Sequence, residues 1–167
     1  MKLGMMFAGL VALTAIACTS ETDSGGGNTG PVAASPLAGT IEGKSFSGKF
    51  AVARKSGFDD SDGERMISIY DTEVKCSSFS AESDAYVLLS VPWKAGTSRD
   101  FSFGGKDSQT ATFVVKKDGK TSNIISTEGR VEILDAPAEA GAKGKLRIRA
   151  TAKGNNVEGE VAVEVCE

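Results

Sequence analysis

Residues 157–165 alternate between small or apolar side chains and mostly acidic ones, and this alternation constrains the fold most. The first set is Val157, Gly159, Val161, Val163 and Val165, and the acidic set is Glu158, Glu160 and Glu164. A side-chain period of two is typical of a strand that buries one face. A similar run over 146–151 precedes it, and Lys153-Gly154-Asn155-Asn156 between them is turn-like. We therefore predict a hairpin with Arg147 and Arg149 on the same outer face as the glutamates.

Short apolar runs separated by turn residues continue through most of the chain. Asp118-Gly119, a favoured dipeptide of tight hairpins, joins two of them. The other predicted strands are Thr40–Phe46, Lys49–Arg54, Met66–Tyr70, Tyr86–Val91, Arg99–Phe103 and Gly129–Leu134. We expect a loop at Ala136–Ala142, because it contains Pro137 and Gly141. Roughly nine or ten strands without a convincing helix predict an all-β fold, an antiparallel β-sandwich or barrel.

The aromatic residues have two interpretations, as part of the core or as a binding surface. We assign Trp93, Phe46, Phe50, Phe101 and Phe113 to the core. The alternative is an exposed aromatic stripe, including Trp93 and Tyr86, that binds a sugar. A true immunoglobulin domain is excluded, because Glu164 stands two residues before Cys166, where its tyrosine corner requires Tyr.

The amino terminus has the pattern of an export signal. Met5 to Ala17 is apolar or small except for Gly9 and Thr14, and it is shorter than the about 20 residues that span a membrane. The residues before Cys18 resemble the lipobox of bacterial lipoproteins, which implies lipidation of Cys18. Ala15-Ile16-Ala17 also fits ordinary secretory cleavage. We expect a signal peptide over 1–17, a lipidated cysteine and flexible polar tether over 18–38, and a β-sheet domain over 39–167.

Three cysteines are an odd number for an exported protein. If Cys18 carries a lipid, Cys76 and Cys166 remain to form a disulfide in an oxidising compartment. Closing a loop of about 90 residues stabilises a fold by roughly 4–5 kcal/mol in the chain-entropy model. The alternative is two free or metal-binding thiols, although no further thiolate ligand exists.

Charge and composition exclude several classes of function. The formal net charge is −3 and no dense Lys/Arg block occurs, which argues against nucleic acid as a partner. The chain has no histidine, so Ser-His-Asp and Cys-His catalysis and His-ligated metals are absent. A carboxylate-dependent hydrolase stays open as an alternative, but no motif selects a pair from the 22 acidic residues. We therefore expect a noncatalytic protein without a cofactor.

One acidic segment has the ligand type that Ca²⁺ prefers. Asp59, Asp60, Asp62 and Glu64 lie within six residues beside Gly63, and Asp71 or Glu73 are further candidates. Hard oxygen ligands at this density suit Ca²⁺, although the EF-hand register fails. The two interpretations are a calcium site and a solvated turn.

The chain as a whole resembles the small, mostly uncharacterised β-sheet lipoproteins of myxobacteria and related Gram-negative bacteria. The matching segments are the lipobox, Gly39–Phe46 (G-x-x-x-G-K-x-F), Ile67–Cys76, Gly129–Leu134 and Val157–Cys166 (x-G-x-[FV]-x-[AV]-x-x-C). Thr19 after the cysteine implies the outer membrane, at its periplasmic face or the cell surface. The resemblance implies a membrane-anchored protein of the cell envelope that binds or scaffolds an envelope protein or glycan. A Ca²⁺-dependent carbohydrate-binding or adhesion module is the alternative.

Overall fold

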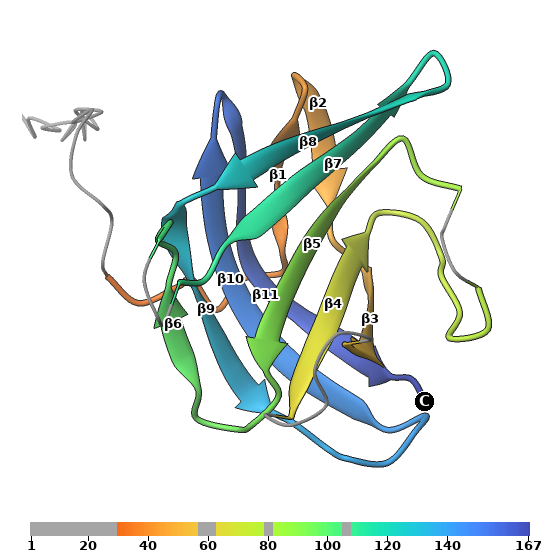
Figure 1. Cartoon of the computed structure of the whole chain (residues 1–167), viewed down its shortest axis with the longest axis vertical. Coiled ribbons are helices and arrows are strands. Elements are labelled where there is room, and N and C mark those ends of the chain that lie inside the picture. The colour runs from red at the N-terminus through yellow and green to blue at the C-terminus, as the bar shows by residue number, and fades with distance from the viewer. Residues whose placement is uncertain (1–29, 57–62, 79–81, 105–107) are drawn as a thin grey trace, which may run out of the picture.

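The computed structural model describes residues 30–56, 63–78, 82–104 and 108–167, and these residues form strands and loops (Figure 1). The strands are β1 (Ala38–Ile41), β2 (Lys44–Ser47), β3 (Phe50–Lys55), β4 (Glu64–Tyr70), β5 (Ala85–Pro92), β6 (Ser98–Asp100), β7 (Ala111–Lys117), β8 (Lys120–Ser126), β9 (Glu128–Asp135), β10 (Lys143–Ala152) and β11 (Asn155–Val165). Among these residues, no helix has the length and apolarity that crossing a membrane requires.

All the strands belong to one sheet that curls into a half-barrel. Their order is β6-β9-β10-β11-β3-β4-β5-β7-β8, and the β1–β2 hairpin attaches to β11 beside this path. The neighbouring strands are antiparallel except β3 and β11, which are parallel and pair Ala51–Ala53 with Val163–Val165. The prediction of an all-β fold with one disulfide is confirmed, and the sheet is mixed because of this one pair.

The β10–β11 hairpin confirms the prediction from residue alternation. Arg147 lies opposite Glu160 and Arg149 opposite Glu158. Its turn contains only Lys153 and Gly154, whose φ angles of 48° and 80° suit a tight hairpin. Asn155 and Asn156, predicted to lie in the turn, are instead the first two residues of β11. Asp118-Gly119 forms the predicted turn between β7 and β8.

The segment predicted as a single strand over Thr40–Phe46 is a hairpin instead. β1 and β2 pair with each other around Glu42 and Gly43, whose φ angles are 50° and 72°. The backbone reverses there because both residues adopt the left-handed conformation, which Gly43 takes without strain. The sequence signal was weak because a Glu occupies the first turn position.

The hydrophobic core fills the inner face of the curled sheet. Its largest fully buried side chains are Phe113, Leu37, Ile67, Ile69, Ile133, Leu146 and Ile148. Of the aromatics assigned to the core, Phe46, Phe101 and Phe113 are buried, whereas Trp93 and Phe50 are half-buried and pack against apolar clusters. A smaller cluster on the outer face contains Val52, Tyr70, Val74 and Cys166.

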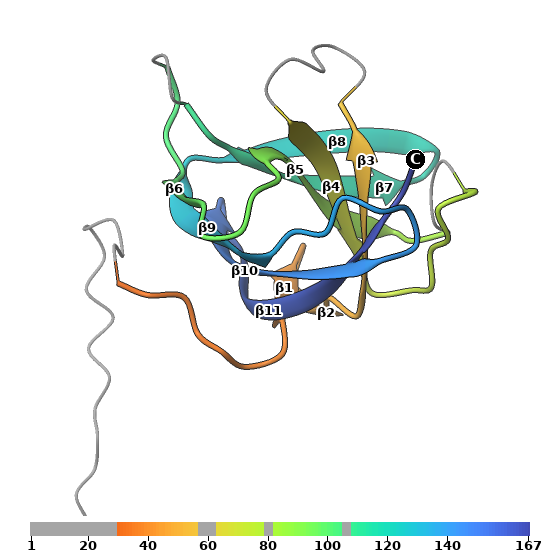
Figure 2. The ribbon, with the colours of Figure 1, turned by 90° about the horizontal axis from the view of Figure 1, so that it is seen from below.

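Residues 30–37, here called the strap, run beside β11 before entering β1 (Figure 2). From the sequence they belong to the predicted flexible tether, yet Leu37 is 1% and Val32 4% exposed. Leu37 N–H donates to Glu160 O at 3.0 Å, and Glu160 N–H donates to Ser35 O at 2.7 Å. The strap is therefore packed and hydrogen-bonded against the sheet.

Candidate functional site

The β1–β2, β7–β8 and β10–β11 turns lie at one end of the half-barrel, here called the mouth (Figure 1). A groove opens there between the β1–β2 turn and the β7–β8 hairpin. It consists of two adjoining hollows of about 330 and 520 Å³ that share residues of β7 and the β1–β2 turn. The lining residues are Ile41, Glu42, Lys44, Asp84, Ala85, Val115, Lys116, Lys117, Asp118, Lys120, Thr121 and Ser122. These volumes are in the range of small-ligand sites.

β8 lies at the edge of the sheet, and its last residue, Ser126, contacts β10. The Ser126 hydroxyl lies 2.8 Å from Thr151 O and accepts from Thr151 N–H at 3.1 Å, so β8 and β10 are joined there. Ser126 is fully buried at this junction. From it β8 runs toward the mouth with β7 as its partner, so the space beside its other edge is open.

Strand alternation determines which side chains face the groove. Phe113 and Val115 of β7 face the core, so Lys117 shares their face, and its cross-strand partner Lys120 does too. Lys44 shares the inner face of β2 with buried Phe46 in the same way. The ammonium groups of Lys44, Lys117 and Lys120 therefore lie on the core-facing side of the sheet, where the sheet reaches the mouth.

The charges of these lysines are unequally compensated. Lys44 Nζ lies 3.5 Å from Asp84 Oδ2 in an exposed ion pair. Lys117 and Lys120 are exposed and directly opposite each other across the hairpin. Like charges in directly opposed positions are unfavourable in a sheet. The pair therefore presents positive charge to the groove that an anion would relieve.

Lys116, by contrast, belongs to the outer face. Its ammonium lies 5.6 Å from the centre of the Tyr86 ring, whose own neighbour is Tyr70 at 5.0 Å. Burial, with a smaller contribution from Tyr70, raises the pKa of Tyr86. Tyr86 contributes to the outer cluster, whereas Trp93 packs on the inner core and donates from Nε1 to Pro137 O at 2.9 Å. The two aromatics do not form a common sugar-binding stripe.

Asn155 lies at the inner end of the mouth. It begins β11 on the same face as Val157 and Val161 of the core, and it is 1% exposed. Its Oδ1 accepts from Glu42 N–H at 2.7 Å, which fixes the β1–β2 turn that lines the groove. Its Nδ2 has no hydrogen-bond partner among the described residues. Asn155 is therefore a buried polar residue that supports the β1–β2 turn from below the groove.

A second cluster of charged residues fastens the strap to the outer face of the sheet. Arg149 donates from Nη2 to Pro31 O at 2.7 Å and to Glu158 Oε1 at 2.9 Å. Glu158 Oε1 also accepts from Ala33 N–H at 3.0 Å. The hydrogen bond from Arg149, aided by Ala33 N–H, holds the pKa of Glu158 below its ordinary value although desolvation opposes this. Lys145 and Arg147 lower the pKa of Glu160 in the same way.

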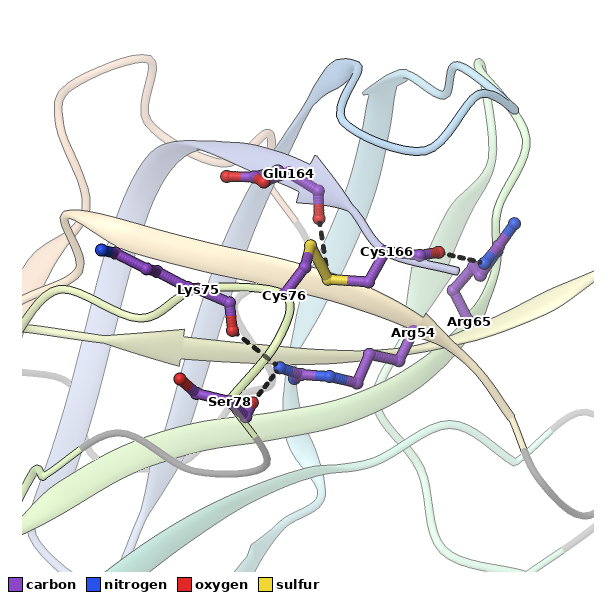
Figure 3. Close-up of a disulfide and its surroundings, with 7 residues drawn as sticks. All are labelled: Arg54, Arg65, Lys75, Cys76, Ser78, Glu164 and Cys166. Carbon is purple, nitrogen blue, oxygen red and sulfur yellow. Dashed lines mark hydrogen bonds between the residues drawn. A yellow bond between two sulfur atoms is a disulfide. The ribbon is translucent and has the colours of Figure 1, made fainter.

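Cys76 and Cys166 form the predicted disulfide, with Cα atoms 5.3 Å apart (Figure 3). It joins the end of β11 to the segment that follows β4 and covers the outer cluster. Arg54 donates from Nη2 to Ser78 O at 2.5 Å and to Lys75 O at 3.3 Å, while Arg65 donates to Cys166 O at 3.1 Å. The two arginines and the disulfide hold this cover against β3 and β4.

The predicted lipidation and calcium residues lie mostly outside the described residues. Cys18 belongs to 1–29, and Asp59, Asp60 and Asp62 belong to 57–62. Glu64 begins β4 and accepts from the Ser90 hydroxyl at 3.0 Å, and Asp71 accepts from the Ser83 hydroxyl at 2.8 Å. Glu73 is exposed. Within 30–56, 63–78, 82–104 and 108–167, no three acidic or cysteine residues gather as metal ligands would.

Comparison with protein-family models, curated proteins and solved structures found no match to this chain. The resemblance to envelope lipoproteins therefore stays a prediction from the sequence, and the site is interpreted from its own geometry. Sequence reasoning missed Lys117, Lys120 and Asn155. The like-charged pair flanking Asp118-Gly119 was a signal that could have indicated the first two.

Proposed function

We propose that this protein is a noncatalytic binding module of the cell envelope, anchored to a membrane through a lipid on Cys18. The groove at the mouth of the half-barrel is its ligand site. This assignment keeps the location predicted from the sequence and gives the binding role a specific surface. Neither catalysis nor a bound cofactor is part of the proposal.

The observation that carries the binding role is the polar inner face of the mouth. Elsewhere the inner face of the sheet is packed with apolar side chains, but at the mouth it ends in Lys44, Lys117, Lys120 and Asn155. Charged side chains next to a core, in a groove of ligand size, are typical of binding sites. The strap supports the anchored arrangement, because it holds the chain leading from Cys18 at a fixed place on β11.

Lipidation is tested by metabolic labelling with an alkyne-tagged fatty acid in a Gram-negative expression host. The wild-type chain should incorporate the label and sediment with membranes, and Cys18→Ser should do neither. Ser20→Ala is the matched control, since it changes a neighbouring residue but leaves Cys18 and the disulfide, and it should keep the label. An unlabelled wild-type chain released into the soluble fraction would contradict the anchor.

Binding at the groove is tested separately by hydrogen exchange of the full chain in detergent, with and without an extract of envelope glycans and lipids. We expect slower exchange in Ile41–Lys44 and Val115–Ser122. Protection confined to the loop before β10, which is hydrogen-bonded to Val165 at the end of β11 opposite the mouth, would show that the groove is not the binding surface.

A further inference from the structure

The groove's chemistry points to one class of ligand, and this inference rests on the proposed function. We infer that the mouth binds an acidic oligosaccharide, with a carboxylate between Lys117 and Lys120. The assignment is argued from three properties of the site: its charge, its polar lining and its open shape.

The charge favours an anion. Lys117 and Lys120 share the inner face directly opposite each other, and the nearby acids are either engaged or in turns. Asp84 is paired with Lys44, and Asp118 and Glu42 occupy the hairpin turns. A carboxylate placed between two ammonium groups accepts charge-assisted hydrogen bonds from both, which are stronger than neutral ones. An uncharged sugar does not relieve the repulsion between the two lysines.

The remaining lining favours a ligand rich in oxygen. Ser122 shares the face of Lys120 on β8 and brings an exposed hydroxyl group to the rim of the groove. Hydroxyl groups of a sugar both donate and accept, so they match a hydroxyl as well as the lysine ammonium groups. The apolar surface is limited to Ile41, Ala85 and Val115, which suits the C–H face of a sugar ring.

The shape distinguishes a saccharide from a lipid tail. The two hollows adjoin along the hairpin and are open to solvent on one side. An acyl chain gains its affinity by removing apolar surface from water, which requires an enclosed apolar cavity. An open trough with lysines on its inner face instead accommodates a chain of acidic sugar units that stays partly solvated.

The experiment is calorimetric titration of the full chain in detergent with trigalacturonate, an acidic trisaccharide. Maltotriose is the uncharged control, and decanoate and inorganic phosphate represent an acyl anion and a bare anion. We expect trigalacturonate to bind at least 10-fold more tightly than the other three. Raising the salt from 50 to 500 mM should weaken binding, because screening reduces attraction between exposed charges.

The test variant is Lys117→Gln/Lys120→Gln at the mouth. Its matched control is Lys55→Gln/Lys94→Gln at the opposite end of the half-barrel, and each double variant removes two exposed lysines. The first pair should weaken trigalacturonate binding at least 10-fold, and the second should leave it within 2-fold.

The outcomes separate this inference from the proposed function. Preference for decanoate or phosphate that depends on Lys117 and Lys120 would overturn the saccharide assignment and keep the groove as the site. Equal binding of maltotriose, or binding that both double variants retain, would overturn the role of the lysine pair. No binding of trigalacturonate overturns the inference, while fatty-acid labelling still tests the anchor independently.

Discussion

Arg149 and Glu158 face each other across β10 and β11 and hold the strap between them. Arg149 Nη2 lies 2.9 Å from Glu158 Oε1, and the arginine binds Pro31 O while the glutamate binds Ala33 N–H. One ion pair of the sheet thus also fastens the segment that connects the domain to the proposed anchor. The Arg149 side chain is 10% exposed and that of Glu158 is 40% exposed, so the guanidinium is shielded from water while the carboxylate stays partly solvated.

Replacing Arg149 with Gln should release the strap. The substitution removes the charge from the Glu158 pair and shortens the side chain that reaches Pro31, so we expect unfolding free energy to fall by about 1–3 kcal/mol. Hydrogen exchange of residues 31–37, measured by mass spectrometry, should accelerate at least 10-fold. Arg147→Gln is the control, because Arg147 pairs with Glu160 and makes no hydrogen bond to the described residues of the strap. Equal exchange in the two variants would contradict this role of Arg149.

Gly159 allows the strap to approach β11, and Gly159→Ala should displace it. A Cβ atom there would lie 2.6 Å from Leu37 Cα and from Ser35 O, and the φ angle is 139°. We expect a loss of about 2–3 kcal/mol in urea unfolding, from strain and from the lost contact of buried Leu37. Gly154→Ala has a positive φ of 80° but open space around its Cβ, so it controls for backbone strain alone. An equal loss in both variants would contradict a steric role for Gly159.

The parts of the fold that were predictable from the sequence are those encoded by neighbouring residues. Alternation through Leu146–Thr151 and Val157–Val165, with Gly154 between, was enough to predict β10, β11 and the ion pairs across them. The parallel pairing of β3 with β11 joins segments about 110 residues apart, and no local pattern reports it.

The strap and the groove were not predicted for similar reasons. Val32 and Leu37 are isolated apolar residues in a small and polar segment, which has the composition of a linker. The mouth brings Lys44 together with Lys117 and Lys120 from distant strands. Asparagine is common in turns, so the sequence alone placed Asn155 in one. It belongs to the strand because the hairpin turn contains only two residues, which the sequence did not reveal.

Loss of the disulfide should destabilise the fold substantially. The Cys76–Cys166 bond closes a loop with a sequence separation of 90, for which the chain-entropy model gives roughly 4–5 kcal/mol. Cys76→Ser should lower the unfolding free energy by about this amount in chemical denaturation. Because Arg54 still binds Ser78 O and Lys75 O, the 71–78 segment should stay near β3 but exchange faster. An unchanged denaturation midpoint would contradict a stabilising disulfide.

Acid should destabilise the protein through the outer-face carboxylates. Glu158 and Glu160 have lowered pKa values because of Arg149 and of Lys145 with Arg147, and Arg130 lowers the pKa of Asp100. A carboxyl whose pKa is lower in the folded state stabilises it above the unfolded pKa of about 4. This contribution is lost as the pH falls through the lowered folded pKa.

The measurement is the urea midpoint between pH 7 and pH 2. The wild-type midpoint should decline below about pH 4, and Glu158→Gln should flatten the decline because it removes one of the titrating groups. Glu73→Gln, at an exposed position of the segment after β4, should keep the wild-type acid transition. Identical pH profiles for the wild type and Glu158→Gln would contradict the coupling of Glu158 to stability.

Calcium removal should leave the protein unaffected if binding at the mouth is its function. The groove proposal uses lysines and an amide, and these side chains do not ligate Ca²⁺ as carboxylates do. We therefore expect the same melting temperature in chelator and in millimolar Ca²⁺, measured by differential scanning fluorimetry. A ligand at about 100 times its Kd would stabilise by roughly 2.7 kcal/mol, a shift of several degrees. Such a shift, abolished by Asp60→Asn/Asp62→Asn, would contradict this prediction and establish a calcium site in the acidic segment, as the alternative of a calcium-dependent module requires.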